Sequence, residues 1–177
     1  MSSHHFVREN QEPGLFIVEW FSGAEELLEQ LAQWAPKIIV HECVLDEVLA
    51  TGTKIDVVLY LKDKEVVEEK TRFQFPIELA EAKSSFEANV RFIEQKYINR
   101  IHIISSLTPE DITFTIAAKL TFFNTTNSFF KIENGFEKWM AKGDEFEIIE
   151  DGIKKECIGN DAIFRFEGKS AFFIEKI

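Results

Sequence analysis

Cysteine is scarce in this chain of 177 residues, and basic side chains are outnumbered by acidic ones. The two cysteines, Cys43 and Cys157, lie far apart, with no paired spacing and no histidine arrangement that suggests a zinc site. The fold therefore needs no disulfide, and we expect a reducing cytoplasm. The net charge is −11, from 31 acidic and 20 basic side chains. Because the electric field of a protein with this net negative charge repels phosphate-rich polymers, we expect no nucleic-acid partner.

Long apolar runs are also missing. The longest, such as residues 55–61, suit buried strands and fall well short of the roughly 20 residues that a membrane-spanning helix needs. The first residues, Met-Ser-Ser-His-His-Phe-Val-Arg, contain no apolar stretch of the signal-peptide type. We therefore expect no membrane partner. His4 and His5 are adjacent and near a terminus, which favours a disordered or lightly docked segment over a metal site.

Strands and helices alternate in the first part of the chain. One face of the helix predicted over residues 24–34 carries Leu27, Leu28, Leu31 and Trp34, and Pro36 ends that helix. Gly52 closes a second, shorter helix. The full set of predicted elements is a strand at 15–20, a helix at 24–34, a strand at 37–41, a helix at 45–50 and a strand at 55–61. This alternation implies parallel β-α-β units.

A charged stretch, residues 62–72, interrupts the alternation and predicts a solvated loop or a short helix. Pro76 then favours an edge strand or an irregular segment over residues 73–79. Residues 84–97 predict a helix, and residues 100–105 predict a further buried strand. Thr108 and Pro109 form a helix-start signal, with the threonine as the cap and the proline in the first turn.

Beyond residue 118 the chain consists of short, aromatic, alternating segments separated by turn signals. Asp151-Gly152, between residues 145–150 and 153–158, is the strongest hairpin signal. Many of the 18 phenylalanines lie in this half, and packing inside a β layer is favoured over a ligand-stacking surface. We therefore predict an α/β domain over residues 1–118, with a Rossmann-like parallel sheet and helices. A small antiparallel, sandwich-like all-β domain follows over residues 119–177.

Three segments carry a resemblance to a known family. In the run from Lys37 to Leu59, a strand and a short helix are followed by Gly52 and Asp56 in a Gly-x-x-x-Asp pattern. The second segment is Phe136-Glu-Lys-Trp-Met-Ala-Lys-Gly, and the third is the opening Ser-His-His-Phe-Val-Arg. Together these segments resemble thiamine pyrophosphokinases. The resemblance implies a nucleotide-binding-like first domain, a homodimer formed through the β domain, and transfer of a pyrophosphoryl group from ATP to thiamine.

That chemistry requires carboxylates that hold Mg²⁺ on the phosphates, together with donors that neutralise the developing charge. Where the family has an Asp-Gly pair, this chain has Glu42-Cys43, so the carboxylate is kept and the glycine is lost. Where the family has Gly-Asp-x-Asp, residues 60–63 keep the last acid, Asp63, and place Lys62 beside it. We expect weak Mg²⁺ binding, with Glu42 and Asp63 as the only candidate metal ligands.

The two remaining motifs are further depleted. The family's Thr-Asp pair falls on Ser84-Ser85, whose hydroxyls can cap a helix but bring no carboxylate. The family's Gly-Arg-x-Asp-His segment falls on residues 107–113, which contain neither arginine nor glycine. No glycine occurs at all between Gly52 and Gly135, although phosphate-binding turns usually depend on glycine.

The pocket candidates are His41, Glu42, Asp63, Ser84 and Ser85, and no residue is assigned as catalytic. His41 joins this set because it precedes Glu42 at the carboxyl end of a predicted strand, where open α/β sheets bind ligands. Three hypotheses remain open. The first is a catalytically degenerate binding or assembly module. The second is an active thiamine diphosphokinase, with Mg²⁺ and ATP, that uses Glu42, Asp63, Glu65 and Glu110. The third is a homodimeric interaction subunit. A bound thiamine or nucleotide is compatible with the first two.

Overall fold

The computed structural model describes residues 13–34, 37–74 and 76–177. The predictions for His4, His5 and Pro36, and the opening segment of the resemblance, lie outside these residues. The chain divides into two compact units. Unit 1 contains the described residues up to Ser105 together with Phe114–Lys119, and unit 2 contains Ser106–Thr113 together with Leu120–Ile177. No helix in the described ranges is long and apolar enough to cross a membrane.

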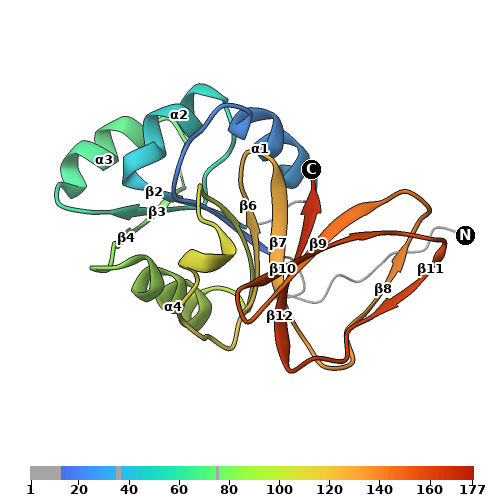
Figure 1. Ribbon diagram of the computed structural model, residues 1–177. Coiled ribbons are helices and arrows are strands. Elements are labelled where there is room, and N and C mark those ends of the chain that lie inside the picture. The colour runs from blue at the N-terminus through green and yellow to red at the C-terminus, as the bar shows by residue number, and fades with distance from the viewer. Residues whose placement is uncertain (1–12, 35–36, 75) are drawn as a thin grey trace, which may run out of the picture. The chain divides into compact units, whose positions relative to one another are not determined.

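Unit 1 is built on a parallel sheet in the order β5-β1-β2-β3-β4 (Figure 1). The parallel β-α-β arrangement predicted from the alternating pattern is confirmed. β4 stands at the edge of this sheet, next to β3. An edge strand therefore follows Pro76, but it begins at Glu78, late in the predicted range of residues 73–79. The strands are β1 Gly14–Ile17, β2 Lys37–His41, β3 Val57–Tyr60, β4 Glu78–Glu81 and β5 Arg100–Ile104.

Helices cover both faces of the parallel sheet. α1, α2 and α3 lie on one side of the sheet and α4 lies on the other, as Figure 1 shows. The helical elements are α1 Ala24–Ala32, the 3-10 turn η1 Glu42–Val44, α2 Leu45–Ala50, α3 Lys64–Thr71 and α4 Phe86–Lys96. The central strands β1, β2 and β3 carry continuous apolar runs, and Leu15, Phe16 and Ile17 of β1 are fully buried.

Two helix predictions need correction or refinement. α1 ends at Ala32, and Trp34, which was predicted to lie on its buried face, is 75% exposed beyond the helix end. The charged stretch after β3 forms the helix α3 rather than a loop. Val67 of α3 is fully buried, and Thr71, one turn later on the same face, is also buried, so this short helix turns a narrow face inward.

Unit 2 contains antiparallel strands in the order β10-β9-β12-β7-β6 and a two-stranded sheet of β11 and β8. A 3-10 turn, η2 Pro109–Asp111, belongs to the same unit, and Thr108 caps it as predicted. The strands are β6 Lys119–Phe123, β7 Asn127–Glu133, β8 Glu137–Met140, β9 Glu145–Glu150, β10 Ile153–Ile158, β11 Ala162–Arg165 and β12 Ser170–Lys176.

Aromatic packing holds unit 2 together. Phe173 of β12 is fully buried, and its ring centroid lies 5.2 Å from that of Phe146 in β9 and 5.8 Å from that of Phe164 in β11. Residues of both sheets therefore share one core, which also includes Met140 of β8. The expected aromatic packing within a β layer is found, since the rings meet in stacked, tilted and edge-on pairs typical of protein interiors.

The hairpin between β9 and β10 forms at the predicted residues. Glu150 pairs with Ile153, so Asp151 and Gly152 are the two turn residues. Both have positive φ angles, 50° and 76°, as a two-residue turn that matches the strand twist requires. Aspartate and glycine tolerate this conformation better than most other residues do, which explains why the dipeptide predicted the turn.

Candidate functional site

The first candidate site lies at the carboxyl ends of the parallel strands of unit 1. Val18 follows β1, His41 ends β2, and Leu61 follows β3. Because these strands are parallel neighbours, their carboxyl ends lie side by side, and open α/β sheets bind their ligands at this end of the strands. The turn η1 places Glu42 and Cys43 at the same end, directly after His41.

A histidine and a cysteine are in contact within this site. The Cys43 sulfur lies 3.0 Å from His41 Nδ1, and the Cys43 backbone N–H donates to the same nitrogen over 3.4 Å. The Cys43 thiol also lies 3.2 Å from the Val18 carbonyl oxygen, to which it can donate. The His41 ring thus caps η1, and the thiol links that turn to the end of β1.

Partial burial shifts the pKa values of both groups of this pair towards their neutral forms. It lowers the pKa of His41 below 6.5, although the negative charge of Glu42 opposes the shift. Burial raises the pKa of the Cys43 thiol above 9.0, and the carboxylates of Glu19 and Glu47 act in the same direction. A nucleophilic cysteine requires a thiolate, usually stabilised by a nearby cation. At pH 7 this pair is therefore a neutral thiol beside a neutral imidazole, not an activated nucleophile.

The two candidate metal ligands bind backbone amides. The Glu42 carboxylate accepts a hydrogen bond from the Leu61 N–H and so joins the end of β2 to the end of β3. Asp63 is the N-cap of α3, and its Oδ1 accepts from the Val66 N–H over 3.3 Å. Within the ranges that the structure describes, no group of three or more His, Cys, Asp and Glu side chains is placed to hold a metal ion.

The serine pair lies between β4 and α4. Ser85 caps α4 by accepting a hydrogen bond from the Ala88 N–H over 3.2 Å, which is the capping role expected from its position. Ser84 is exposed. Just before it, the buried side chain of Asn89 accepts from the Lys83 N–H over 2.7 Å and donates to the Lys83 carbonyl over 3.3 Å. Asn89 was not among the predicted pocket residues, although a polar residue on an otherwise apolar helix face could have marked it.

The acids of the alternative catalytic set are distributed over different elements. Glu65 is exposed in the first turn of α3, and Glu110 is exposed in η2, which belongs to unit 2. The structure thus brings His41, Glu42 and Cys43 together at η1, while Asp63 and Ser85 each cap a different helix.

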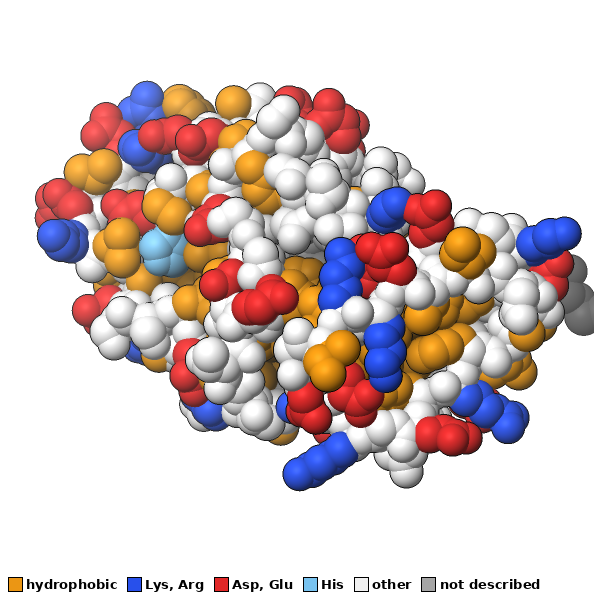
Figure 2. Space-filling model, viewed as in Figure 1, with side chains coloured by type: hydrophobic (Ala, Val, Ile, Leu, Met, Phe, Trp, Pro, Cys, Tyr) orange, Lys and Arg blue, Asp and Glu red, His pale blue; other side chains and the backbone are white. Residues whose placement is uncertain are grey.

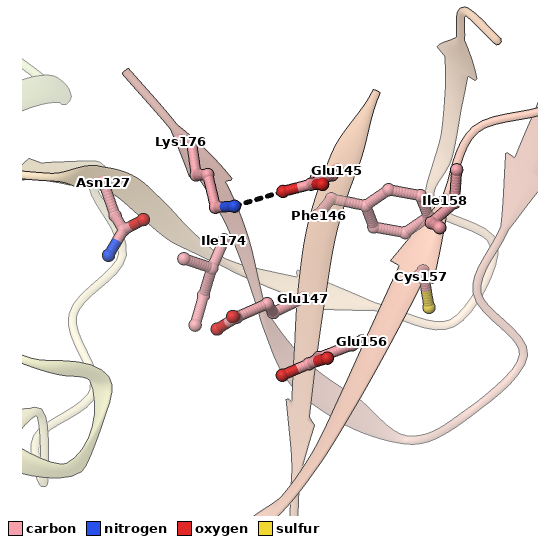
Figure 3. A pocket seen from close by; sticks show the side chains of 9 residues that line it. All are labelled: Asn127, Glu145, Phe146, Glu147, Glu156, Cys157, Ile158, Ile174 and Lys176. Carbon is pink, nitrogen blue, oxygen red and sulfur yellow. Dashed lines mark hydrogen bonds and ion pairs between the residues drawn. The ribbon is translucent and has the colours of Figure 1, made fainter. Parts of the chain in front are cut away.

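A second candidate site is a cavity of about 360 Å³ within unit 2 (Figure 3). Two ion pairs border it: Lys176 pairs with Glu145, and Lys154 Nζ lies 2.8 Å from a Glu147 carboxylate oxygen. No sequence motif marked this site, because its residues come from separate strands that only the sheet register brings together. It is lined by Asn127, Glu145, Phe146, Glu147, Glu156, Cys157, Ile158, Ile174 and Lys176.

A parallel α/β sheet unit followed by an antiparallel β unit is the architecture that several solved thiamine pyrophosphokinases share with this chain. The enzyme from Bacillus subtilis is 9% identical, with a TM-score of 0.65 over 93% of this chain and 99% of that one. For the enzyme from Geobacillus thermodenitrificans the corresponding values are 10%, 0.61, 92% and 96%.

A eukaryotic structure gives the same result. Thiamin pyrophosphokinase from Candida albicans is 8% identical, with a TM-score of 0.52 over 93% of this chain and 86% of that one. No family model and no curated protein sequence matches the chain. The fold is therefore that of thiamine pyrophosphokinases, as the resemblance indicated, while identities this low establish the fold alone.

Proposed function

We propose that this chain is a non-catalytic protein of the thiamine pyrophosphokinase fold that acts as an assembly module in the cytoplasm. The proposal rests on what the two remaining acidic side chains of the family's motifs contact. Glu42 and Asp63 accept hydrogen bonds from the backbone amides of Leu61 and Val66, and so serve local structure.

Pyrophosphoryl transfer makes demands that these residues do not meet. The reaction needs metal ions on the phosphates and donors that neutralise charge in the transition state. Mg²⁺ requires oxygen ligands in near-octahedral geometry, and Lys62 stands next to Asp63 where a further acid would be needed. Ser84 and Ser85 add hydroxyls but no negative charge.

An exposed face of the β8–β11 sheet supports the assembly role. Trp139 of β8 is 60% exposed and pairs in register with Ile163 of β11, which is 52% exposed. Two positions along, and therefore on the same face, Glu137 pairs with Arg165, and the two form an ion pair at 2.8 Å. We refer to these four residues as the β8–β11 face. Exposed apolar side chains beside charged ones are typical of protein interaction sites.

This face is complementary to a second copy of itself. Two copies can meet face to face about a two-fold axis that runs parallel to the strands, midway between β8 and β11. β8 of one copy then lies over β11 of the other. Trp139 would then face Ile163 of the second copy, and Glu137 would face Arg165 of the second copy. Because the apolar pair and the ion pair each join the two strands in register, both contacts form together. The face is small for a stable dimer, which buries about 800 Å² per partner, so we expect weak association.

A coupled assay with thiamine, ATP and Mg²⁺ tests the absence of catalysis, with the Bacillus subtilis enzyme as the positive control. We expect no turnover. Turnover that disappears in Glu42→Ala or Asp63→Ala would contradict the proposal and would establish the alternative, an active thiamine diphosphokinase with a rearranged acidic site. A thermal scan with thiamine, thiamine pyrophosphate, ATP and AMP would show whether a ligand is still bound.

Sedimentation over a range of protein concentrations tests the assembly role. We expect a dimer that forms at tens to hundreds of micromolar and is lost in Trp139→Ala. Trp34→Ala is the matched control, because Trp34 is an exposed tryptophan of unit 1. A monomer at all concentrations, or equal loss of the dimer in both variants, would refute assembly through the β8–β11 face.

A further inference from the structure

Two carboxylates oppose each other on the wall of the unit 2 cavity. Glu147 of β9 pairs directly with Glu156 of β10 in the antiparallel register, and Figure 3 shows both side chains on the same side of the sheet. Side chains opposed in this way have Cβ atoms about 4.5–5.5 Å apart, and like charges at such positions destabilise a sheet. Lys154 already pairs with Glu147, and a further cation bound between the two carboxylates would relieve the repulsion that remains.

The lysines around the cavity leave part of this negative charge uncompensated. Lys154 pairs with Glu147, and Lys176 pairs with Glu145. No hydrogen bond or ion pair to the Glu156 carboxylate is found within the described ranges. The pKa of Lys154 is raised by its hydrogen bond to Glu147, and the charge of Glu156 adds to that effect. Three carboxylates against two ammonium groups leave the cavity with a net negative charge.

The apolar part of the cavity wall is aliphatic. Ile158 of β10 and Ile174 of β12 line the cavity together with the carboxylates. Phe146 also lines it, but its ring packs in the core of unit 2, 5.1 Å from the ring of Phe164 and 5.2 Å from that of Phe173. The lining thus offers methyl and methylene contacts to a ligand, and no aromatic face is free for stacking with a flat ring.

The size of the cavity and the placement of its acids argue against a metal ion. Its volume, about 360 Å³, falls in the range of small-molecule pockets, roughly 300–1,000 Å³. The glutamates line this space, yet no three acidic, histidine or cysteine side chains of the described residues converge as metal ligands. A ligand that matches both features carries its positive charge on a larger, partly apolar body.

We propose that this cavity binds an aliphatic amine, a small molecule with protonated amino groups on a methylene chain. One ammonium group lies between Glu147 and Glu156 and donates hydrogen bonds to both carboxylates, while the chain lies against Ile158 and Ile174. This site goes beyond the proposed function, because it depends neither on the loss of catalysis nor on the β8–β11 face.

Calorimetric titration of the full-length protein with spermidine tests the site, at low ionic strength because salt screens exposed charges. We expect saturable binding that Glu156→Gln weakens about threefold to fivefold, as for the loss of one exposed ion pair. Glu133→Gln is the matched control, because it removes one exposed acid of β7 outside the cavity. This control should bind spermidine as the unmodified protein does.

Three outcomes would overturn the proposal. An equal loss of spermidine affinity in both variants would show that binding depends only on the overall charge of −11. Saturable binding of thiamine without binding of spermidine would assign the cavity to an aromatic cation. Binding of Mg²⁺ that is lost in Glu156→Gln would make it a metal site. An independent measurement is the stability of the unliganded protein: Glu156→Gln should unfold at a higher urea concentration, and a lower midpoint would contradict the repulsive pair.

Discussion

The sulfur of Cys43 lies 3.0 Å from Nδ1 of His41, at the point where β2 passes into η1. The arrangement has the residue types of a nucleophile and its base, but partial burial shifts both pKa values towards the neutral thiol and the neutral imidazole. The pair instead stabilises the turn, since the ring accepts from the Cys43 N–H and the thiol reaches the Val18 carbonyl oxygen.

Slow alkylation of Cys43 follows from its raised pKa. In a Cys157→Ser background, which leaves one thiol, the reaction with iodoacetamide at pH 7.5 should be slower in the folded protein than in urea. The rate should keep rising with pH beyond 9.0, because the thiolate is the reactive form. Fast alkylation of the folded protein at pH 7 would show instead that the thiol is activated.

Protonation of His41 should destabilise the protein. Its pKa is lower in the folded state than the unperturbed value of 6.5, so near pH 6 the unfolded chain binds more protons. The free energy of unfolding should therefore be highest above pH 6.5 and should fall as the pH drops from 6.5 towards the folded-state pKa.

Urea unfolding of the unmodified protein and of His41→Asn, at pH 7.5 and pH 5.5, measures this effect. Asparagine keeps a side chain that can cap η1 but does not titrate. The loss of stability on acidification should be smaller in the variant. Part of the loss should remain, because burial also lowers the pKa of His102. An identical pH dependence in both proteins would exclude the role assigned to His41.

The serine pair provides a matched test of capping. Ser85→Ala removes the acceptor for the Ala88 N–H at the start of α4, and it should lower the free energy of unfolding by about 1 kcal/mol. Ser84→Ala changes a neighbouring exposed hydroxyl and should have little effect. Equal effects in the two variants would mean that the cap adds no stability.

The carboxylate of Glu42 should stabilise unit 1. Glu42→Ala leaves the Leu61 N–H without its acceptor, and we expect a loss of about 1 kcal/mol in the free energy of unfolding. Glu42→Gln keeps an oxygen that can accept this hydrogen bond and should lose less. If Glu42→Ala is as stable as the unmodified protein, the link between β2 and β3 has no energetic importance.

Local signals predicted much of the secondary structure at the right residues. The strand β2, the helix α2 and the β9–β10 hairpin have the predicted bounds. Each is defined by neighbouring residues, such as Asp151 and Gly152, whose conformational preferences act within the turn itself. Trp34 was misplaced because its spacing fits the apolar face of α1, although the helix ends at Ala32.

The sequence alone determined the order of strands and helices, the resemblance to thiamine pyrophosphokinases and the loss of acids and glycines from the motifs. Those features depend on residue types and on spacing along the chain. Only the tertiary structure decided what the remaining acids contact and that Glu147 and Glu156 oppose each other beside a cavity. Sheet register and helix position set these contacts, and both result from packing between segments that are distant in the sequence.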